Sequence, residues 1–376
     1  MSGEVDPRVN IGILGGGQLG RMLSLSAYPL GIATTVLDPT VRVSASKVCH
    51  QLQADYDDPA ALKELVNRSD VVTYEFENIP EESLENVADE IAVYPPKQAL
   101  EVSDDRLTEK RYFGNLGIET TEIRPIASES DLREAAKRLG LPLIVKTRRM
   151  GYDGKGQAHV ERQVQISDAW DVLDGRESIA EAKVDFRREL SVLGVRGIDG
   201  SIRIYPIVEN IHREGILVES RAPAPGLDGD LRKKARRYCR DILEDLDYVG
   251  ILAVELFETD DGLLASEMAP RVHNSGHWTI EGTQTSQFEN HIRAVAGLPL
   301  GSAEAVGHTR MLNIIGEHPD RNELLSYPDV HLHDYEKAPR PGRKIGHVTI
   351  QSDDPDRADQ LIDEIRPLVT SSRDLG

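Results

Sequence analysis

The sequence predicts a mixed α/β and α+β protein built from several units, and three observations support this prediction. Along the first hundred residues, short apolar runs alternate with stretches of helical period, which is typical of a parallel sheet covered by helices. From about residue 118 strands dominate, and the last 70 residues read as a small α+β appendage. A chain of 376 residues also exceeds one ordinary hydrophobic core, so two or three domains are expected.

The expected elements follow in a regular order. Strands are expected at 11–14, 34–37 and 70–76, with a helix over 59–69. The pair Pro95–Pro96 marks a stop, and a capped helix is expected to begin at Ser103. The remaining expected elements are strands at 121–128 and 141–148 around a helix at 128–140, a strand-dense region at 187–223, a charged helix at 230–246, and a strand pair at 249–259 and 262–270.

The composition excludes several classes of protein. Asp and Glu total 64 against 44 Lys and Arg, a net charge of −20, and such a surface repels nucleic acids and anionic membranes. No apolar run is long enough to span a membrane, and MSGEVDPRVN lacks the apolar core of a secretory signal. Cys49 and Cys239 are too few for a disulfide scaffold, so the cytoplasm is the expected location. The charge suits a cell of high internal salt, although an acidic protein of ordinary salt is the alternative.

The stretch NIGILGGGQLGRML carries the first chemical signal. Gly15, Gly17 and Gly20 have the spacing G-x-G-x-x-G after an apolar run, and Asp38 closes the next apolar run. This spacing is the dinucleotide fingerprint, in which glycines admit a phosphate and an acid binds a ribose hydroxyl. The motif alone is weak evidence, so an NAD-binding Rossmann-like domain is one of two interpretations.

The hairpin GILAVELFETDDGLLASEMAP carries the strongest signal. A three-residue turn at Asp260, Asp261 and Gly262 would place Glu255 directly opposite Glu267. Two like charges facing each other among apolar neighbours destabilise a sheet, and a hard divalent cation is the natural partner. The sequence therefore predicts a metal site, with a pair of exposed edge acids or a register shifted by one residue as the alternatives.

Three further stretches indicate anion binding. RRMGYDGKGQAHV is a glycine-rich loop whose backbone donors could close over phosphates, and Lys146 stands just upstream in an apolar strand that gives it no partner. In EMAPRVHNSGH, polar side chains crowd beside Glu267, and Arg271 offers two-point recognition of a carboxylate-like anion. In RPGRKIGH, Arg340, Arg343 and Lys344 form a basic cluster suited to a substrate phosphate. The alternatives are a lysine that reaches solvent, a chance polar loop and a charge-balancing turn.

Together, a strand lysine, a glycine loop and two strand-borne acids resemble the ATP-grasp fold, in which two α+β subdomains clasp ATP. GGGQLGRM, TYEFENI, GYDGKGQ and EMAPRVHNSGH are similar, in this order, to successive signatures of the 5-(carboxyamino)imidazole ribonucleotide synthase family. The resemblance runs over essentially the whole chain. It implies a Rossmann-like pre-ATP-grasp domain at 1–108, a lid subdomain at 109–188, a large subdomain with the metal site at 189–307 and a small C-terminal α+β domain at 308–376.

The resemblance also implies an activity. ATP phosphorylates bicarbonate to carboxyphosphate, and the exocyclic amine of 5-aminoimidazole ribonucleotide is then carboxylated, directly or by released carbon dioxide, in de novo purine biosynthesis. Such an ADP-forming ligase requires Mg²⁺, is expected to be a homodimer, and passes its product to a downstream mutase. In phosphoryl transfer the protein mainly positions groups and neutralises charge, which suits the residue types found.

Residue by residue, the resemblance implies the following roles. ATP contacts are implied for Arg106, Lys146, the closing loop Gly151, Tyr152, Asp153, Gly154, Lys155, Gly156 and Gln157, the adenine hinge Glu181, Ala182, Lys183 and Val184, and Glu189, His212, Ser266 and Glu267. Mg²⁺ ligation is implied for Glu255 and Glu267, and catalytic contacts for Arg271, His273, Asn274 and Asp153. Contacts to the ribonucleotide are implied for Gln18, Glu75, Asn78, Tyr152, Arg271, Ser275, Arg343 and Lys344.

One departure and three alternatives accompany this interpretation. Ser266 stands where family members commonly carry Asn, which predicts retuned nucleotide or metal contacts rather than lost activity. The nearest alternative is a formate-dependent glycinamide ribonucleotide transformylase, which has a similar loop. The others are an NAD-dependent oxidoreductase and a nucleotide-binding regulator without catalysis, and intact Lys146, Glu255 and Glu267 argue against the last.

Overall fold

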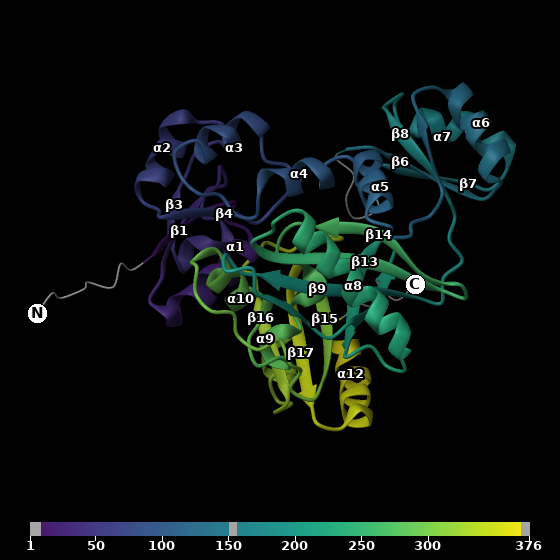
Figure 1. Ribbon diagram of the computed structural model, residues 1–376. Coiled ribbons are helices and arrows are strands. Elements are labelled where there is room, and N and C mark those ends of the chain that lie inside the picture. Colours follow the sequence, from purple (N-terminus) through teal and green to yellow (C-terminus); the bar gives the residue numbers. More distant parts are fainter. Residues whose placement is uncertain (1–8, 150–155, 370–376) are drawn as a thin grey trace, which may run out of the picture.

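The computed structural model describes residues 9–149 and 156–369 and shows three units around three sheets (Figure 1). The first unit is a parallel four-stranded sheet of order β3-β2-β1-β4, which confirms the expected alternation of strands and helices. Its elements are β1 (Asn10–Leu14), α1 (Gln18–Ala27), β2 (Ala33–Leu37), β3 (His50–Leu52), α2 (Pro59–Asn67), β4 (Val71–Tyr74) and α3 (Glu81–Ala88).

Two short helices lead out of the first unit, and here the expected helix start is wrong. Ser103 ends α4 (Lys97–Ser103), and α5 (Arg106–Asn115) begins three residues later. Asp105 is the N-cap, because its carboxylate accepts from the backbone N–H groups of Leu107 and Thr108. The cap also places Arg106 at the first helical position, which faces the site described below.

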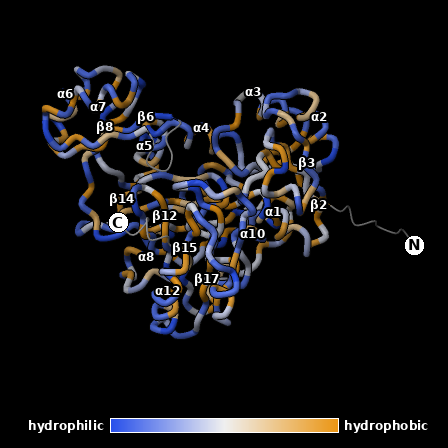
Figure 2. Tube along the Cα trace, turned by 180° about the vertical axis from the view of Figure 1, so that it is seen from behind, coloured by the Kyte–Doolittle hydropathy of each residue, from blue (hydrophilic) through white to orange (hydrophobic). Residues whose placement is uncertain are grey.

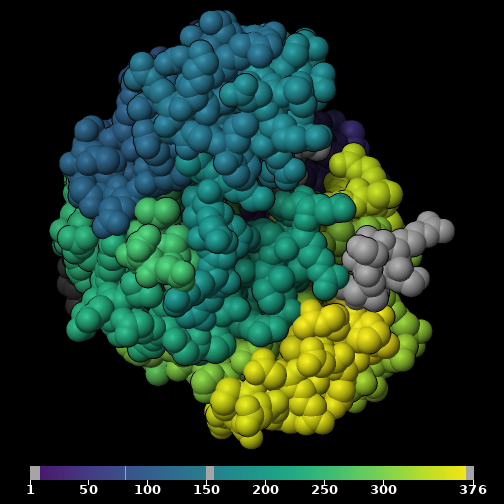
Figure 3. Space-filling model, turned by 90° about the vertical axis from the view of Figure 1, so that its right-hand side faces the viewer, coloured from purple at the N-terminus to yellow at the C-terminus, as the bar shows by residue number. Residues whose placement is uncertain are grey.

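The second unit is a small antiparallel sheet of order β5-β8-β6-β7, called the lid here. It comprises β5 (Ile123–Ile126), α6 (Glu129–Leu139), β6 (Leu143–Thr147), β7 (Gln157–Val160), α7 (Ile166–Val172) and β8 (Ser178–Ala182). The lid has a hydrophobic core of its own, centred on Leu132, Val145 and Ile166. It stands over the other units as the blue lobe in Figure 3.

The third unit is a nine-stranded antiparallel sheet of order β14-β13-β9-β11-β12-β15-β17-β16, with β10 beside β9. Its elements are β9 (Arg188–Arg196), β10 (Ile202–Ile204), β11 (Val208–Arg213), β12 (Ile216–Ala222), α8 (Gly229–Asp245), β13 (Gly250–Thr259), β14 (Gly262–Ala269), α9 (Thr279–Gly282), α10 (Gln287–Val295), β15 (His308–Ile315), α11 (Arg321–Leu324), β16 (Val330–Asp334), β17 (Lys344–Ser352) and α12 (Pro355–Val369). The C-terminal strands continue this sheet, because β15 pairs with β12.

The first and third units share a hydrophobic core. Leu23 on α1 and Phe288 on α10 belong to one buried cluster, which also includes residues of both sheets. Figure 2 shows the apolar positions gathered inside the molecule along these sheets. The two units therefore form a common base, and the lid is the part with a separate core.

Candidate functional site

The glycine turn after β1 is filled by the protein's own side chain. The carboxylate of Glu75, just after β4, accepts from the backbone N–H groups of Gly17 and Gly20. A Cβ atom at Gly17 would lie 2.8 Å from Glu75 Oε1, so only glycine admits this carboxylate. The acid of the fingerprint is occupied as well: Asp38 Oδ2 accepts from Gly16 N–H at 3.0 Å and from the Tyr56 hydroxyl at 3.1 Å. The donors and the acid that a dinucleotide would need are thus already paired.

A cavity of about 960 Å³ lies where the first unit, the lid and the large sheet meet. It brings together most of the predicted site residues that the structure describes. Its lining includes Gln18, Glu75, Asn78, Arg106, Lys146, Gln157, Glu189, His212, Glu255, Ser266, Glu267, Arg271, His273, Asn274, Arg343 and Lys344. Segments more than 300 residues apart in sequence therefore face one space.

The acids on β13 and β14 face each other as expected, but the turn between the strands differs from the expected one. Glu255 lies directly opposite Glu267, but Thr259 pairs with Gly262 and closes a two-residue turn, so the expected three-residue turn is wrong. Asp261 N–H donates to the Thr259 hydroxyl, which helps to hold the tighter turn. A β-bulge at Ser266 restores the register at the acids.

The two acids differ in environment. Burial raises the pKa of Glu255 to about 7, and the facing Glu267 adds to the effect. The Glu267 side chain is 48% exposed, which corrects the expectation that both acids are poorly hydrated. Arg106 Nη2 lies 3.8 Å from Glu267 Oε2. Among the described residues no group of three or more His, Cys, Asp or Glu could hold a metal ion.

Lys146 on β6 has an internal partner. Its Nζ lies 2.7 Å from Glu181 Oε2, and Lys110 on α5 lies 3.4 Å from Glu181 Oε1. Burial opposes ionisation of Glu181, but the two lysines outweigh it and lower its pKa to about 2. Two cations share one carboxylate, so the Lys146 ammonium retains positive charge for a phosphate in the cavity.

The structure describes the predicted adenine hinge at 181–184 but only Gly156 and Gln157 of the predicted closing loop. Glu181 lies behind Lys146, and Ala182 C=O accepts from the Thr121 hydroxyl at 2.9 Å. Lys183 and Val184 line a separate hollow of about 410 Å³. Gly156 has a φ of 69°, and a Cβ atom there would meet Thr147 Oγ1 at 2.6 Å, so glycine is required. The predicted loop residues Gly151, Tyr152, Asp153, Gly154 and Lys155 lie outside the described residues.

Next to the acid pair, His212 on β11 is held by Glu189 on β9. His212 Nδ1 lies 2.9 Å from Glu189 Oε2. Burial opposes the charged imidazole, but the contact with Glu189 and the charge of Glu255 raise the pKa of His212. The pair therefore places a carboxylate and an imidazole of raised pKa on the wall of the cavity.

The polar loop after β14 surrounds the other side of the acid pair. Arg271 Nη2 lies 3.1 Å from Glu77 Oε1, and His273 Nε2 lies 3.5 Å from Glu255 Oε1. Burial, Arg271 and Lys344 lower the pKa of His273 well below its usual value, so this imidazole is neutral. Ser275 does not line the cavity; its backbone N–H and its hydroxyl both contact His273 Nδ1. With a backbone donor on Nδ1, the proton of His273 sits on Nε2 and points at Glu255.

The basic turn reaches the same cavity from the C-terminal side. Arg340, Arg343 and Lys344 line it, and Lys337 donates to the Gln18 side chain. Sequence reasoning missed Lys337, although it lies in the same basic segment. It also missed Glu77, which belongs to the motif that supplied its neighbours Glu75 and Asn78.

Two neighbours of Arg106 were missed as well. Glu109 Oε1 accepts from the Met268 backbone N–H at 2.7 Å and so ties α5 to β14 beside Glu267. Lys110 contacts Glu181, as described above. Spacings of three and four residues from Arg106 put both on one face of α5, and this periodicity could have identified them.

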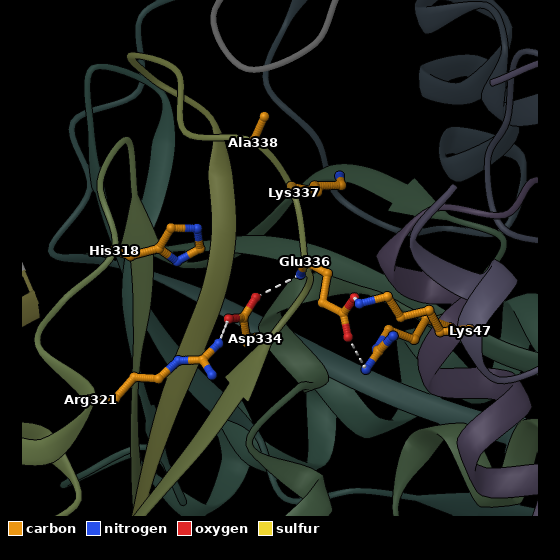
Figure 4. A pocket seen from close by; sticks show the side chains of 8 residues that line it. Lys47, His318, Arg321, Asp334, Glu336, Lys337 and Ala338 are labelled. Carbon is orange, nitrogen blue, oxygen red and sulfur yellow. Dashed lines mark hydrogen bonds and ion pairs between the residues drawn. The ribbon is translucent and has the colours of Figure 1, made fainter. Parts of the chain in front are cut away.

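A second hollow of about 670 Å³ adjoins the cavity and shares Lys337 with it. Figure 4 shows that both of its carboxylates are engaged by its own cations: Arg321 pairs with Asp334, and Arg21 and Lys47 pair with Glu336. Because both carboxylates pair with cations from the two sides of the hollow, we interpret it as a docking contact. It joins the first unit to residues 333–344, called the strap here.

Within residues 9–149 and 156–369, no helix has the length and apolar character that a membrane crossing requires.

Comparison with known proteins agrees with this geometry. Three family models match the chain: the ribonucleotide synthetase preATP-grasp domain over 9–104, the ATP-grasp domain over 111–288, and the phosphoribosylaminoimidazole carboxylase C-terminal domain over 309–361. Together they cover most of the sequence in the order expected.

Curated relatives and solved structures match over nearly the full length. N5-carboxyaminoimidazole ribonucleotide synthase of Pseudomonas aeruginosa is 45% identical over 96% of this chain and 99% of its own. The crystal structure of the synthetase from Thermus thermophilus has a TM-score of 0.92 at 48% identity, covering 96% of this chain and 99% of that one. The synthase from Aspergillus clavatus in complex with ADP and 5-aminoimidazole ribonucleotide has a TM-score of 0.90 at 33% identity, covering 96% and 98%.

Proposed function

The chain belongs to the N5-carboxyaminoimidazole ribonucleotide synthase family, and from this premise we propose that it carboxylates 5-aminoimidazole ribonucleotide with ATP and bicarbonate. The observation that carries the proposal is the single cavity in which a lysine pair, a facing acid pair, a polar anion loop and a basic turn meet. ATP phosphorylates a bicarbonate oxygen to give carboxyphosphate and ADP. The amine nitrogen then bonds to the carboxyl carbon, phosphate leaves, and the nitrogen loses one proton.

ATP is proposed to occupy the side of the cavity beneath the lid. Arg106 and Lys146 supply positive charge for its phosphates, and Gln157 extends the same wall. Glu189 and His212, already paired with each other, line the wall that the large sheet provides. Residues 151–157 are proposed as the closing loop and 181–184 as the adenine hinge, as the family resemblance implies.

Mg²⁺ fits the acid pair. Two carboxylates held opposite each other, one of them with a pKa raised by burial, form a donor set that a hard cation would neutralise. Glu255 and Glu267 would hold the ion, and nucleotide phosphates and water would supply its remaining ligands. When bound, the ion would neutralise charge on the phosphates during transfer. Ser266, the bulge residue next to Glu267, stands where family members commonly carry Asn and is proposed to retune this contact.

Bicarbonate is proposed to bind at the polar loop. Arg271 offers a guanidinium to its carboxylate-like face once Glu77 yields part of that contact, and His273 offers its Nε2 proton. Exclusion of water by the loop at 151–157, with Asp153 and Tyr152 near the amine, would protect the carboxyphosphate from hydrolysis. Asn274 is not proposed as a bicarbonate contact, because Asn313 already engages both polar atoms of its side-chain amide.

The ribonucleotide is proposed to bind between the first unit and the strap. Arg343 and Lys344 suit its phosphate, and Gln18, Glu75 and Asn78 line the opposite wall. A cytoplasmic homodimer that hands its product to a mutase, with domain boundaries near 108, 188 and 307, completes the proposal.

The proposal is tested by ADP release with MgATP and bicarbonate, with and without 5-aminoimidazole ribonucleotide. Release that requires the ribonucleotide supports the synthase. Turnover with formate and glycinamide ribonucleotide instead, and none with bicarbonate, would show that the chain is a transformylase and that the assignment of the polar loop to bicarbonate is wrong.

A further inference from the structure

Three imidazole rings stack at the wall of the cavity, where His277 is a lining residue. His277, which follows the polar loop, packs against His347 of β17 with ring centres 5.0 Å apart and planes 24° apart. His347 packs against His333 of β16 at 4.3 Å and 10°. His277 and His347 are 1% and 0% exposed. Burial lowers the pKa of His277 to about 3 and that of His347 well below its usual value, so both rings are uncharged and pack without repulsion.

The imidazole stack contacts two different segments of the site. His277 Nδ1 lies 3.3 Å from the Asn274 side-chain amide. The Tyr335 hydroxyl lies 2.7 Å from His347 Nδ1, and His333 Nε2 lies 2.8 Å from Glu281 Oε1. The stack therefore connects the polar loop, which carries Asn274, to the strap, which carries Tyr335.

Asn274 is held by protein partners on both atoms of its amide. Its Nδ2 donates to Asn313 Oδ1 at 3.1 Å, and its Oδ1 accepts from Asn313 Nδ2 at 2.8 Å. Asn313 on β15 is 1% exposed and also donates to the Leu217 backbone carbonyl at 2.9 Å. With His277 on the remaining donor, both N–H groups of Asn274 are used, so it has none left to offer bicarbonate.

The strap is also fixed to the first unit. The Ser44 hydroxyl donates to the Tyr335 backbone carbonyl at 2.7 Å. Glu336, with a φ of 56°, then pairs with Arg21 and Lys47 (Figure 4). Lys337 lines the cavity and donates to the Gln18 side chain. A change in the position of Tyr335 would thus move the basic residues that line the cavity.

We propose that the imidazole stack is a positioning device that sets the polar loop and the strap at a fixed separation. His277, His347 and Asn313 are the positioning residues, and His277 and Asn313 act by holding the Asn274 side chain. The inference rests on the proposed function, in which the polar loop holds the activated carboxyl group and the strap holds the ribonucleotide. A fixed separation brings the amine within reach of the carboxyphosphate before it hydrolyses. Loosening the stack would let ATP be cleaved without carboxylation.

The test compares Tyr335→Phe and His347→Phe with His291→Phe. Tyr335→Phe removes only the hydroxyl that contacts His347, and His347→Phe keeps an aromatic ring but removes its acceptor. His291 is a matched control, because it is fully buried, has two hydrogen-bond partners, Thr73 and Ile251, and does not line the cavity. Product formed per ADP released, KM for each substrate and Tm are measured for all three.

We expect both stack variants to form less product per ADP and to lose about 10- to 100-fold in kcat/KM for the ribonucleotide, with KM for ATP unchanged. His291→Phe should lower Tm with the ratio of product to ADP unchanged. A wild-type ratio in Tyr335→Phe or in folded His347→Phe would overturn the inference and leave the stack as ordinary core. Failure of the proposed function would look different, because the wild-type protein would then release no ADP that depends on the ribonucleotide.

Discussion

The glycine turn and the acid hairpin carry motifs that are equally clear in the sequence. In the structure, the polar groups of the turn have partners within the protein, whereas the two carboxylates of the hairpin face each other. At the turn, the donors of Gly17 and Gly20 are already satisfied by Glu75. At the hairpin, Glu255 faces Glu267, and burial raises the pKa of Glu255 to about 7. A motif indicates a ligand site when its polar or charged groups lack partners within the protein. It indicates a structural role when other residues of the protein already bind those groups.

The sharpest test of this comparison is Glu267→Gln. The substitution removes one proposed metal ligand with little change in volume, so turnover should fall by about 10³-fold or more while the fold is retained. ADP release and circular dichroism would measure the two effects. Asp261→Asn, on the exposed turn of the same hairpin, is the control and should retain activity. Full turnover of Glu267→Gln with magnesium would refute the metal assignment.

Glu75→Gln tests whether the glycine turn depends on the carboxylate that fills it. A glutamine has one acceptor where the turn offers two N–H donors, so one donor is left unpaired and stability should fall by about 1–3 kcal/mol. Urea unfolding would measure the loss, with Glu82→Gln on the exposed face of α3 as the control. Unchanged stability would mean that the turn does not depend on Glu75. Binding of NAD by either the wild type or the variant would count against the architectural interpretation.

Glu255→Gln should raise stability without metal in a pH-dependent way. The pKa of Glu255 in the fold is about 7 against an ordinary 4.5, so the folded state favours the protonated form. Its contribution is complete below about pH 4.5 and is lost as the pH rises to about 7. Because glutamine mimics the protonated form at every pH, the variant should exceed the wild type by about 3 kcal/mol at pH 8 and match it near pH 4.5. Unfolding with a chelator at both pH values would show it, and a less stable variant at pH 8 would contradict it.

The smallest expected effect concerns the net charge of −20. Screening of self-repulsion predicts a modest rise of Tm and activity between low and molar potassium chloride. Thermal unfolding over a salt series would measure it. A flat series would argue against adaptation to high internal salt.

Much of the site could be predicted because local patterns fix it. A short turn between two apolar runs places the acids on neighbouring strands, and a lysine inside a strand requires a partner. The partner of Lys146 proved to be Glu181 on the neighbouring strand β8, which the pattern around Lys146 alone could not identify. The predicted pairing of Glu255 with Glu267 was right although the predicted turn was one residue too long. The extra residue in the bulge at Ser266 makes up for the shorter turn.

The remaining features depend on contacts between distant segments. Nothing near Asn313 in sequence indicates that its amide pairs with Asn274, 39 residues away. The imidazole stack joins segments whose histidines show no common period, and the filling of the glycine turn by Glu75 spans 58 residues. The helix start at Arg106 rather than after Ser103 reflects competition among three adjacent capping residues, which local propensity alone does not decide.

The central claim is that one cavity joins phosphoryl transfer to carboxylation, and bicarbonate labelled with ¹⁸O tests it most directly. If bicarbonate attacks ATP, the oxygen that bridges carbon and phosphorus stays with phosphorus when the carboxyl group is transferred. Phosphate released in the presence of 5-aminoimidazole ribonucleotide should then carry one ¹⁸O atom. Unlabelled phosphate, formed alongside carboxylated product, would contradict the account.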